Sequence, residues 1–179
     1  MNTKANIRYA RALYALGEEY NLSDSIYGDM KMLMDVFFAD RELRALMANP
    51  TIPNSIKKKA LTLFFDGKIE SLTLRFLHLL IDRNRETNTY WIAYQYMDIY
   101  RWNHNISCAK VRVAVPIDKQ IREIFEKWLQ DKVEGKVELS IKQNSDLIGG
   151  FTLRVGWRYI DQSLSWRMNT LKRELNKKI

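Results

Sequence analysis

The chain has 179 residues, of which 46% are hydrophobic and 28% are charged, a composition typical of a globular protein with a hydrophobic core. It contains no continuous run of the ~18–20 apolar residues that a membrane-spanning helix needs, and its first residues show no signal-peptide pattern. The formal net charge of +8 is uneven, because residues 1–105 carry 14 Lys and Arg against 12 Asp and Glu, whereas residues 106–179 carry 15 against 9. This asymmetry predicts two domains with different partners.

The first predicted helix covers about residues 6–20 and has apolar side chains on two sides. On a helical wheel one stripe contains Tyr9, Leu13, Leu16 and Tyr20, with Ala12 at its edge, and Ile7 and Tyr14 lie nearly opposite. A surface helix normally has one apolar stripe. The pattern therefore leaves two interpretations: a central helix buried on most sides, or a helix that keeps one side for a partner.

Five further helices follow within residues 1–105. The second has Ser23 and Asp24 as candidate caps, and the later ones are expected over residues 42–48, 54–65, 69–83 and 87–105. Pro50 and Pro53 separate the third helix from the fourth, because proline lacks an amide donor and restricts the residue before it. The helix over residues 69–83 is apolar on almost all sides, like the first helix.

The spacing of apolar residues predicts which face of the fourth helix is buried. Its inward residues are expected to be Ile56, Ala60, Leu63 and Phe64. The three consecutive lysines at 57–59 are then expected on the solvated side.

The periodicity changes to two after residue 105. Strands are expected over residues 110–115, 137–142, 151–155 and 158–160, and helices over residues 119–133 and 163–177. The helix over 119–133 has an apolar stripe of Ile121, Ile124, Phe125 and Trp128. Gly149 and Gly150 are expected to form a tight turn before a strand. The fold class is therefore α+β, with an N-terminal six-helix bundle over residues 1–105 and a small α/β C-terminal domain over residues 106–179.

No catalytic or cofactor-binding motif is found in the sequence. His78 and His104 have no Cys or carboxylate at a metal-like spacing, and Cys108 has no partner for an internal disulfide. Phosphate-loop, nucleophile-elbow and zinc-protease patterns do not occur. We therefore expect a protein that is not an enzyme and that has no cofactor or metal.

Several stretches, in order along the whole chain, resemble the delta subunit of the F-type ATP synthase, a relative of the mitochondrial oligomycin-sensitivity-conferring protein. The matching stretches are residues 8–13 (RYARAL), Asn49-Pro50, Arg85, residues 147–151 (LIGGF), Gly156 and residues 160–163 (IDQS). The chain departs from the family pattern at Asn144-Ser145, where the family usually has Asp-Pro. It also departs at Trp157, usually acidic, and at Gln162, usually glycine. These are turn positions, so the departures concern local loop geometry.

The resemblance implies a stator subunit that acts mechanically. Its N-terminal bundle would bind the alpha subunits of the catalytic head, with the beta subunits as further candidates, and its C-terminal domain would meet the b subunits of the peripheral stalk. Association with the membrane, at the cytoplasmic side of a bacterial cell, would come only through the complex. In the family the alpha segment lies between the first and fifth helices, and this predicts a binding site of Tyr9, Ala12, Leu13, Leu16, Phe76, Leu79 and Arg83.

The basic C-terminal half and its aromatic residues keep a second interpretation open, a nucleic-acid-binding protein. Against it, acidic residues are interspersed among the positive charges, and no single helix face is basic. No nucleic-acid partner is therefore expected.

Overall fold

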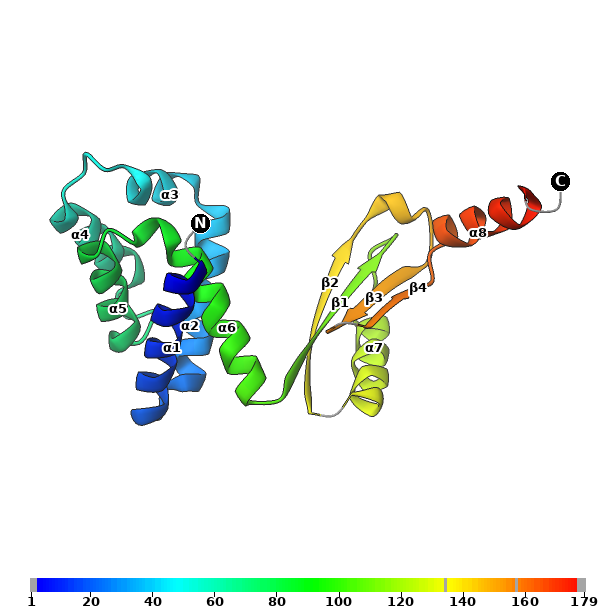
Figure 1. Ribbon diagram of the computed structural model, residues 1–179, viewed down its shortest axis with the longest axis horizontal. Coiled ribbons are helices and arrows are strands. Elements are labelled where there is room, and N and C mark those ends of the chain that lie inside the picture. Colours follow the sequence, from blue (N-terminus) through cyan, green and yellow to red (C-terminus); the bar gives the residue numbers. More distant parts are fainter. Residues whose placement is uncertain (1–2, 134, 157, 177–179) are drawn as a thin grey trace. The chain divides into compact units, whose positions relative to one another are not determined.

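The computed structural model describes residues 3–133, 135–156 and 158–176, and the chain divides into two compact units, Met1–Trp102 and Asn103–Ile179 (Figure 1). The expected domain boundary lay between residues 105 and 106. The described part of the first unit is helical. Its elements are α1 (Thr3–Glu19), α2 (Ser23–Ala39), α3 (Arg41–Ala48), α4 (Asn54–Phe65), α5 (Ser71–Asp82), the 3-10 helix η1 (Glu86–Asn88) and α6 (Thr89–Asn103).

The core of the first unit is built around Tyr96 of α6, whose side chain is fully buried. Its hydroxyl donates a hydrogen bond to the Ser23 carbonyl at 3.2 Å, and the ring of Tyr14 on α1 meets its ring edge-on at a centroid distance of 5.9 Å. Gly17 permits this packing, since a Cβ there would lie 3.3 Å from both the Tyr96 hydroxyl and the Ser23 Cα. Helices α1, α2 and α6 are thereby joined at one point.

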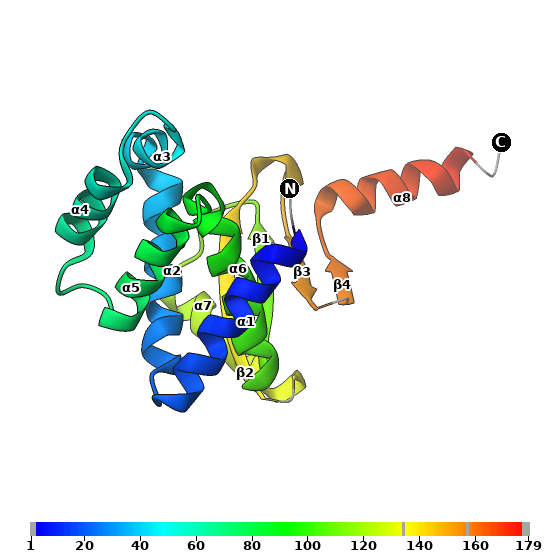
Figure 2. The same cartoon turned by 60° about the vertical axis from the view of Figure 1, so that its left-hand side comes forward.

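Helix α4 has the predicted bounds but buries a different face. The buried residues are Lys57, Leu61 and Phe65, whereas Ile56 is 51% exposed and Leu63 is 85% exposed. The predicted inward face was therefore wrong, and so was the solvated position assigned to Lys57. The physical reason is tertiary: α4 and α5 lie side by side (Figure 2), and the Lys57 ammonium ends against Glu86 of η1, 29 residues away.

The caps predicted for α2 are wrong, whereas α3 has a side-chain cap that was not predicted. The Asp40 carboxylate accepts a hydrogen bond from the Leu43 amide at 2.9 Å and so caps α3. Helix α2 begins at Ser23, so Ser23 and Asp24 lie inside its first turn and neither side chain caps it. Asp24 instead accepts a hydrogen bond from the Tyr100 hydroxyl at 2.6 Å.

The second unit has the predicted order of strands and helices. Its described elements are β1 (Ile106–Val113), α7 (Lys119–Lys132), β2 (Lys136–Gln143), the 3-10 helix η2 (Ser145–Leu147), β3 (Phe151–Val155), β4 (Arg158–Asp161) and α8 (Leu164–Asn176). The four strands form one sheet in the order β2-β1-β3-β4. Strands β1 and β2 are parallel, and the β1–β3 and β3–β4 pairs are antiparallel. Trp157, at the predicted turn before β4, lies outside the described residues, as does the end of the last predicted helix, residue 177.

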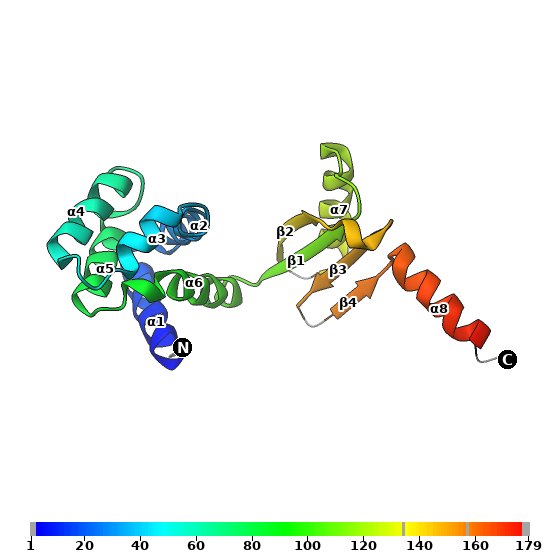
Figure 3. The same cartoon turned by 90° about the horizontal axis from the view of Figure 1, so that it is seen from above.

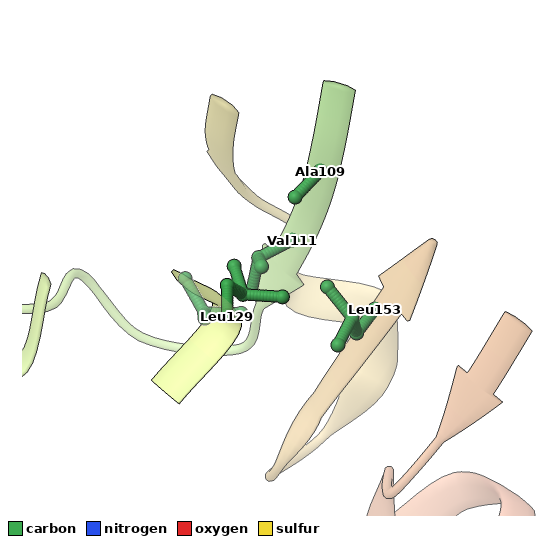
Figure 4. Close-up of a cluster of buried hydrophobic side chains, with 5 residues drawn as sticks. Ala109, Val111, Leu129 and Leu153 are labelled. Carbon is green, nitrogen blue, oxygen red and sulfur yellow. The ribbon is translucent and has the colours of Figure 1, made fainter. Parts of the chain in front are cut away.

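Helix α7 covers one face of this sheet (Figure 3), and a small core lies between them. Leu129 of α7 points toward Ala109 and Val111 of β1 and Leu153 of β3 (Figure 4). All four side chains are at most 2% exposed. The alternation predicted for the first strand is thus confirmed for Val111 but not for Val115, which is 67% exposed beyond the end of β1.

The apolar stripe predicted for α7 is largely exposed. Ile124 is 64% exposed, Trp128 is 44% exposed and Phe125 is half-buried. The fully buried residue of α7 is Leu129, which the spacing had not singled out. Leu129 and Phe125 pack against the core of the sheet, whereas the rest of the predicted stripe, Ile121, Ile124 and Trp128, is exposed.

The glycine pair forms the predicted tight turn. Gly150 has φ +79°, and a Cβ at this position would clash with the Gln162 carbonyl oxygen. A Cβ at Gly149 would overlap the Leu164 side chain, and the Gly149 carbonyl accepts a hydrogen bond from the Leu164 amide at 2.9 Å. These contacts hold the start of α8 against the turn before β3. At the level of class, the predicted α+β fold is confirmed: a helical N-terminal part precedes a small four-stranded sheet.

Candidate docking site

Helix α1 has a buried stripe and an exposed apolar side. Asn6, Ala10, Leu13 and Gly17 face the core. Three of the predicted site residues lie outside this stripe, because Leu16 is 40% exposed, Ala12 is exposed and Tyr9 is half-buried. Leu13, at 1% exposure, is part of the core. The structure therefore supplies an apolar outer strip at spacings of three and four along α1.

Helix α5 repeats this arrangement. Phe76 is 8% exposed and belongs to the core, whereas Leu79 is 42% exposed. Arg75 and Arg83 are exposed and lie four residues before and after Leu79, so the three side chains share one face at the helical repeat. Leu13 and Phe76 thus hold the two strips in place from inside, and in this structure they present little surface to a partner.

The two strips have different electrostatic surroundings. Arg75 and Arg83 place positive charge on both sides of Leu79 on α5. On α1, burial raises the pKa of Tyr14, and the Glu18 carboxylate adds to the rise. Exposed apolar residues flanked by arginine favour an amphipathic partner that carries carboxylates.

Asp29 connects α2 to the start of α5 and was not recognised from the sequence. Its Oδ2 accepts hydrogen bonds from the Glu70 amide at 3.0 Å and the Thr73 hydroxyl at 2.6 Å. Burial raises the pKa of this carboxyl above its ordinary value, against the opposing effect of the two hydrogen bonds. The available signal was a carboxylate between Ile26 and Met30, two residues of the buried stripe of α2.

Lys57 and Glu86 form a second buried contact that the sequence did not indicate. The Lys57 ammonium lies 2.6 Å from Glu86 Oε1 and donates to the Met47 carbonyl at 3.0 Å. Both side chains are at most 10% exposed. This pair joins α4 to η1 and to the end of α3, and the only local signal for it was the spacing of Lys57 with Leu61 and Phe65.

A groove of about 420 Å³ lies within the second unit, between α7 and the strands β3 and β4. Its lining residues are Trp128, Leu129, Lys132, Val133, Leu153, Val155, Arg158 and Ile160. Trp128 and Ile160 are 44% and 41% exposed, so an apolar surface remains open beside two basic residues. Near the end of β4, the hydrogen bonds that the Ser163 side chain and amide donate to Asp161 lower the pKa of its carboxyl.

The potentially reactive side chains of His78 and Cys108 are part of the packed structure. His78 lies 3.2 Å from the Thr62 hydroxyl, and Cys108 is a half-buried residue of β1. Within residues 3–133, 135–156 and 158–176, no group of three or more His, Cys, Asp or Glu side chains could hold a metal ion. Helices long and apolar enough to cross a membrane are likewise not found in these ranges.

These exposed apolar surfaces on a small α+β scaffold define a class of protein that acts by binding other proteins. The sequence profile of the ATP synthase delta (OSCP) subunit matches residues 5–175, and the chain belongs to this family. It is 33% identical to the ATP synthase subunit delta of Parabacteroides distasonis over 165 residues, covering 92% of each chain. It is 35% identical to that of Synechococcus elongatus over 164 residues, covering 91% of each.

Among solved structures, a chain of the Toxoplasma gondii mitochondrial ATP synthase hexamer matches with a TM-score of 0.72 at 22% identity, covering 95% of this chain and 96% of that chain. At this identity the match supports the fold. Family membership makes the protein a non-catalytic stator subunit of the membrane-associated ATP synthase, as the resemblance implied. The comparisons give no support to the alternative of a nucleic-acid-binding protein.

Proposed function

We propose that the six helices of the first unit act as one bundle that docks the N-terminal segment of an alpha subunit of the catalytic head. The binding site consists of the outer strips of α1 and α5, with Tyr9, Ala12, Leu16, Leu79 and Arg83 in contact and with Leu13 and Phe76 supporting them from the core. The observation that carries this proposal is the exposure of Leu16 (40%) and Leu79 (42%) on two helices that each bury another face in the core.

The chemistry of the strips indicates the kind of segment that binds. Apolar anchors at spacings of three and four match the repeat of an amphipathic helix laid along a groove. Arg75 and Arg83 are exposed on the same face as Leu79, so carboxylates on the segment would form charge-assisted hydrogen bonds with them. The beta subunits of the head are further candidates for contacts at the rim of this site.

The second unit is proposed to bind the end of the b subunits. The groove beside Trp128 and Ile160 offers an apolar surface, and Lys132 and Arg158 place positive charge in its wall. Together with the head contact, this would join the head to the peripheral stalk and resist the torque of the central shaft. In a bacterial cell the subunit would then lie at the cytoplasmic side of the membrane, held there by the complex.

The test is a titration of the full-length, isotope-labelled chain with a synthetic peptide of the alpha subunit N-terminus, followed by amide NMR spectra. We expect shifts of the amide signals to be concentrated in α1 and α5. Leu79→Asp should lower the affinity at least about tenfold, because the apolar anchor that the peptide covers becomes a negative charge next to the peptide's carboxylates.

The matched control is Leu63→Asp, which changes an 85% exposed leucine on α4 that lies outside the strips. This variant should bind within about twofold of the wild type, since a peripheral exposed residue contributes little to an interface. Unchanged amide signals in α1 and α5 at saturating peptide would contradict the assignment of the site.

A further inference from the structure

A pocket of about 350 Å³ lies in the first unit, away from the strips of α1 and α5. It is formed by the end of α2, helix α3, η1 and the start of α6. Its lining residues are Phe37, Phe38, Arg44, Met47, Ala48, Glu86, Thr87, Tyr90 and Trp91. Phe38 is 77% exposed and Trp91 is 39% exposed, so two large aromatic side chains of this wall remain uncovered. Exposed aromatic residues beside a pocket are typical anchors of a protein interface.

Glu86 gives this pocket a specific polar requirement. The residue is 8% exposed, and its Oε1 is held by the Lys57 ammonium at 2.6 Å. Its Oε2 is buried and accepts no hydrogen bond from any residue that the structure describes. A buried acceptor left without a donor is costly, so the pocket favours an occupant that supplies one. Since Lys57 already neutralises the carboxylate, a neutral donor suits this oxygen better than a second cation.

Arg44 adds a charged group to the pocket wall. Its Nη1 donates to the carbonyls of Phe37 at 2.6 Å and Phe38 at 2.5 Å, where α2 ends. Within the described residues its Nε and Nη2 donors make no hydrogen bond. A guanidinium with free donors at an exposed position is suited to a carboxylate.

We propose that this pocket is a second protein-docking site of the first unit. Its occupant is an amphipathic segment of another protein that packs an apolar side chain against Phe38 and Trp91. The segment donates a neutral hydrogen bond to Glu86 and presents a carboxylate to Arg44. A small molecule fits less well, because such sites bury most of their ligand, whereas a protein segment can also cover a side chain as exposed as Phe38.

The test uses the full-length chain and, as its probe, purified ATP synthase head stripped of this subunit; this choice of probe rests on the proposed function. Trp91→Ala removes the exposed aromatic wall and should weaken binding at least about tenfold. Trp102→Ala is the matched control, since Trp102 lies on the same helix, is 85% exposed and does not line the pocket. It should bind within about twofold of the wild type. Hydrogen exchange on binding should slow at α3 and η1.

A Trp91→Ala chain that binds the head as tightly as the wild type overturns the proposal. If Leu79→Asp weakens binding in the same experiment, the pocket alone is refuted and the proposed function stands. If neither variant weakens binding, both are refuted. A folded Glu86→Gln chain with unchanged affinity overturns the hydrogen bond to Glu86, and thermal unfolding of each variant establishes that it is folded.

Discussion

At the scale of single residues, two buried ionisable groups organise the first unit. Asp29 binds the first turn of α5 from α2, and Lys57 joins α4 to Glu86 of η1. Buried charges are tolerated only when they are paired or hydrogen-bonded. Each of these groups has partners far away in sequence, so Asp29 ties α2 to the start of α5, and Lys57 ties α4 to α3 and η1.

Lys57→Met leaves the Glu86 carboxylate buried without its counter-charge. Breaking a buried ion pair by removing one partner typically costs ~3–5 kcal/mol, so we expect a loss of this size in the free energy of unfolding. Urea denaturation followed by circular dichroism measures it. Lys59→Met, at an exposed position of the same helix, should change this free energy by less than ~0.5 kcal/mol.

A double variant separates the charge effect from loss of packing. Lys57→Met combined with Glu86→Leu replaces the pair by apolar groups, which is often neutral. It should recover most of the stability lost in Lys57→Met. A double variant that is less stable than the single variant would show that the contact matters for some reason other than its buried charges.

Asp29→Asn tests the raised pKa of Asp29. Because the pKa of Asp29 is higher in the folded state, proton binding to this carboxyl favours folding. The resulting gain in stability is fully present at a pH below the ordinary carboxyl pKa. It is lost as the pH rises through the raised pKa of the folded state. Asparagine keeps an acceptor oxygen and cannot titrate. The wild type should therefore gain stability relative to Asp29→Asn as the pH is lowered from 7 toward 4.5, measured by urea unfolding at each pH.

Asp29→Ala is the control for the hydrogen bonds themselves. It removes the acceptor for both the Glu70 amide and the Thr73 hydroxyl, and loss of such a cap costs ~0.5–2 kcal/mol. This loss should appear at pH 7, where Asp29→Asn is close to the wild type. Equal stability of the alanine and asparagine variants at pH 7 would contradict the capping role.

At the scale of elements, the turn at Gly149 and Gly150 sets where β3 begins and where α8 starts. The Gln162 amide donates to the Phe151 carbonyl at 2.9 Å, and the Leu164 amide donates to the Gly149 carbonyl at 2.9 Å. Ser163 then caps α8, with its Oγ accepting from the Trp166 amide at 3.2 Å. The geometry of this turn depends on close approaches that only residues without a Cβ allow.

Gly150→Ala should destabilise the second unit by more than ~1 kcal/mol, because it adds a Cβ against the Gln162 carbonyl at a φ of +79°. Native-state hydrogen exchange at the β3 and β4 amides measures the effect locally. Gly28→Ala is the contrasting change: it lies within α2, a Cβ there meets no atom within 4 Å, and alanine is the better helix former. It should stabilise the first unit by ~0.5–1 kcal/mol.

At the scale of the whole molecule, the two units differ in charge and in the surfaces they expose. Residues 1–105 carry a small excess of positive charge, 14 basic against 12 acidic residues, and present apolar strips on helices. Residues 106–179 carry 15 basic against 9 acidic residues and present a groove beside a sheet. A stator needs two separate attachments that transmit force without chemistry, and two compact units with different surfaces suit this requirement.

Deletion of residues 106–179 should separate the two attachments. The remaining residues 1–105 should still bind the isolated catalytic head, whereas the head should no longer be recovered with the membrane sector through the stalk. Co-purification from membranes, with ATP hydrolysis as the readout for the head, measures this. Recovery of the head with the stalk in the absence of residues 106–179 would contradict the proposed role of the second unit.

The sequence alone determined the order and bounds of most elements, because breaks such as Pro50 and Pro53 and the change of period after residue 105 are local signals. It also determined the family, through short stretches along the whole chain.

Only the tertiary structure decided which faces are buried. Helix α4 was predicted to bury Ile56, Leu63 and Phe64, yet it buries the stripe that contains Lys57, which pairs with Glu86, 29 residues away. Leu13 and Leu16 looked equivalent on one stripe, yet the folded unit buries Leu13 to 1% exposure and leaves Leu16 40% exposed. Periodicity specifies that a face is apolar, whereas the choice between core and surface depends on long-range contacts that no local pattern contains.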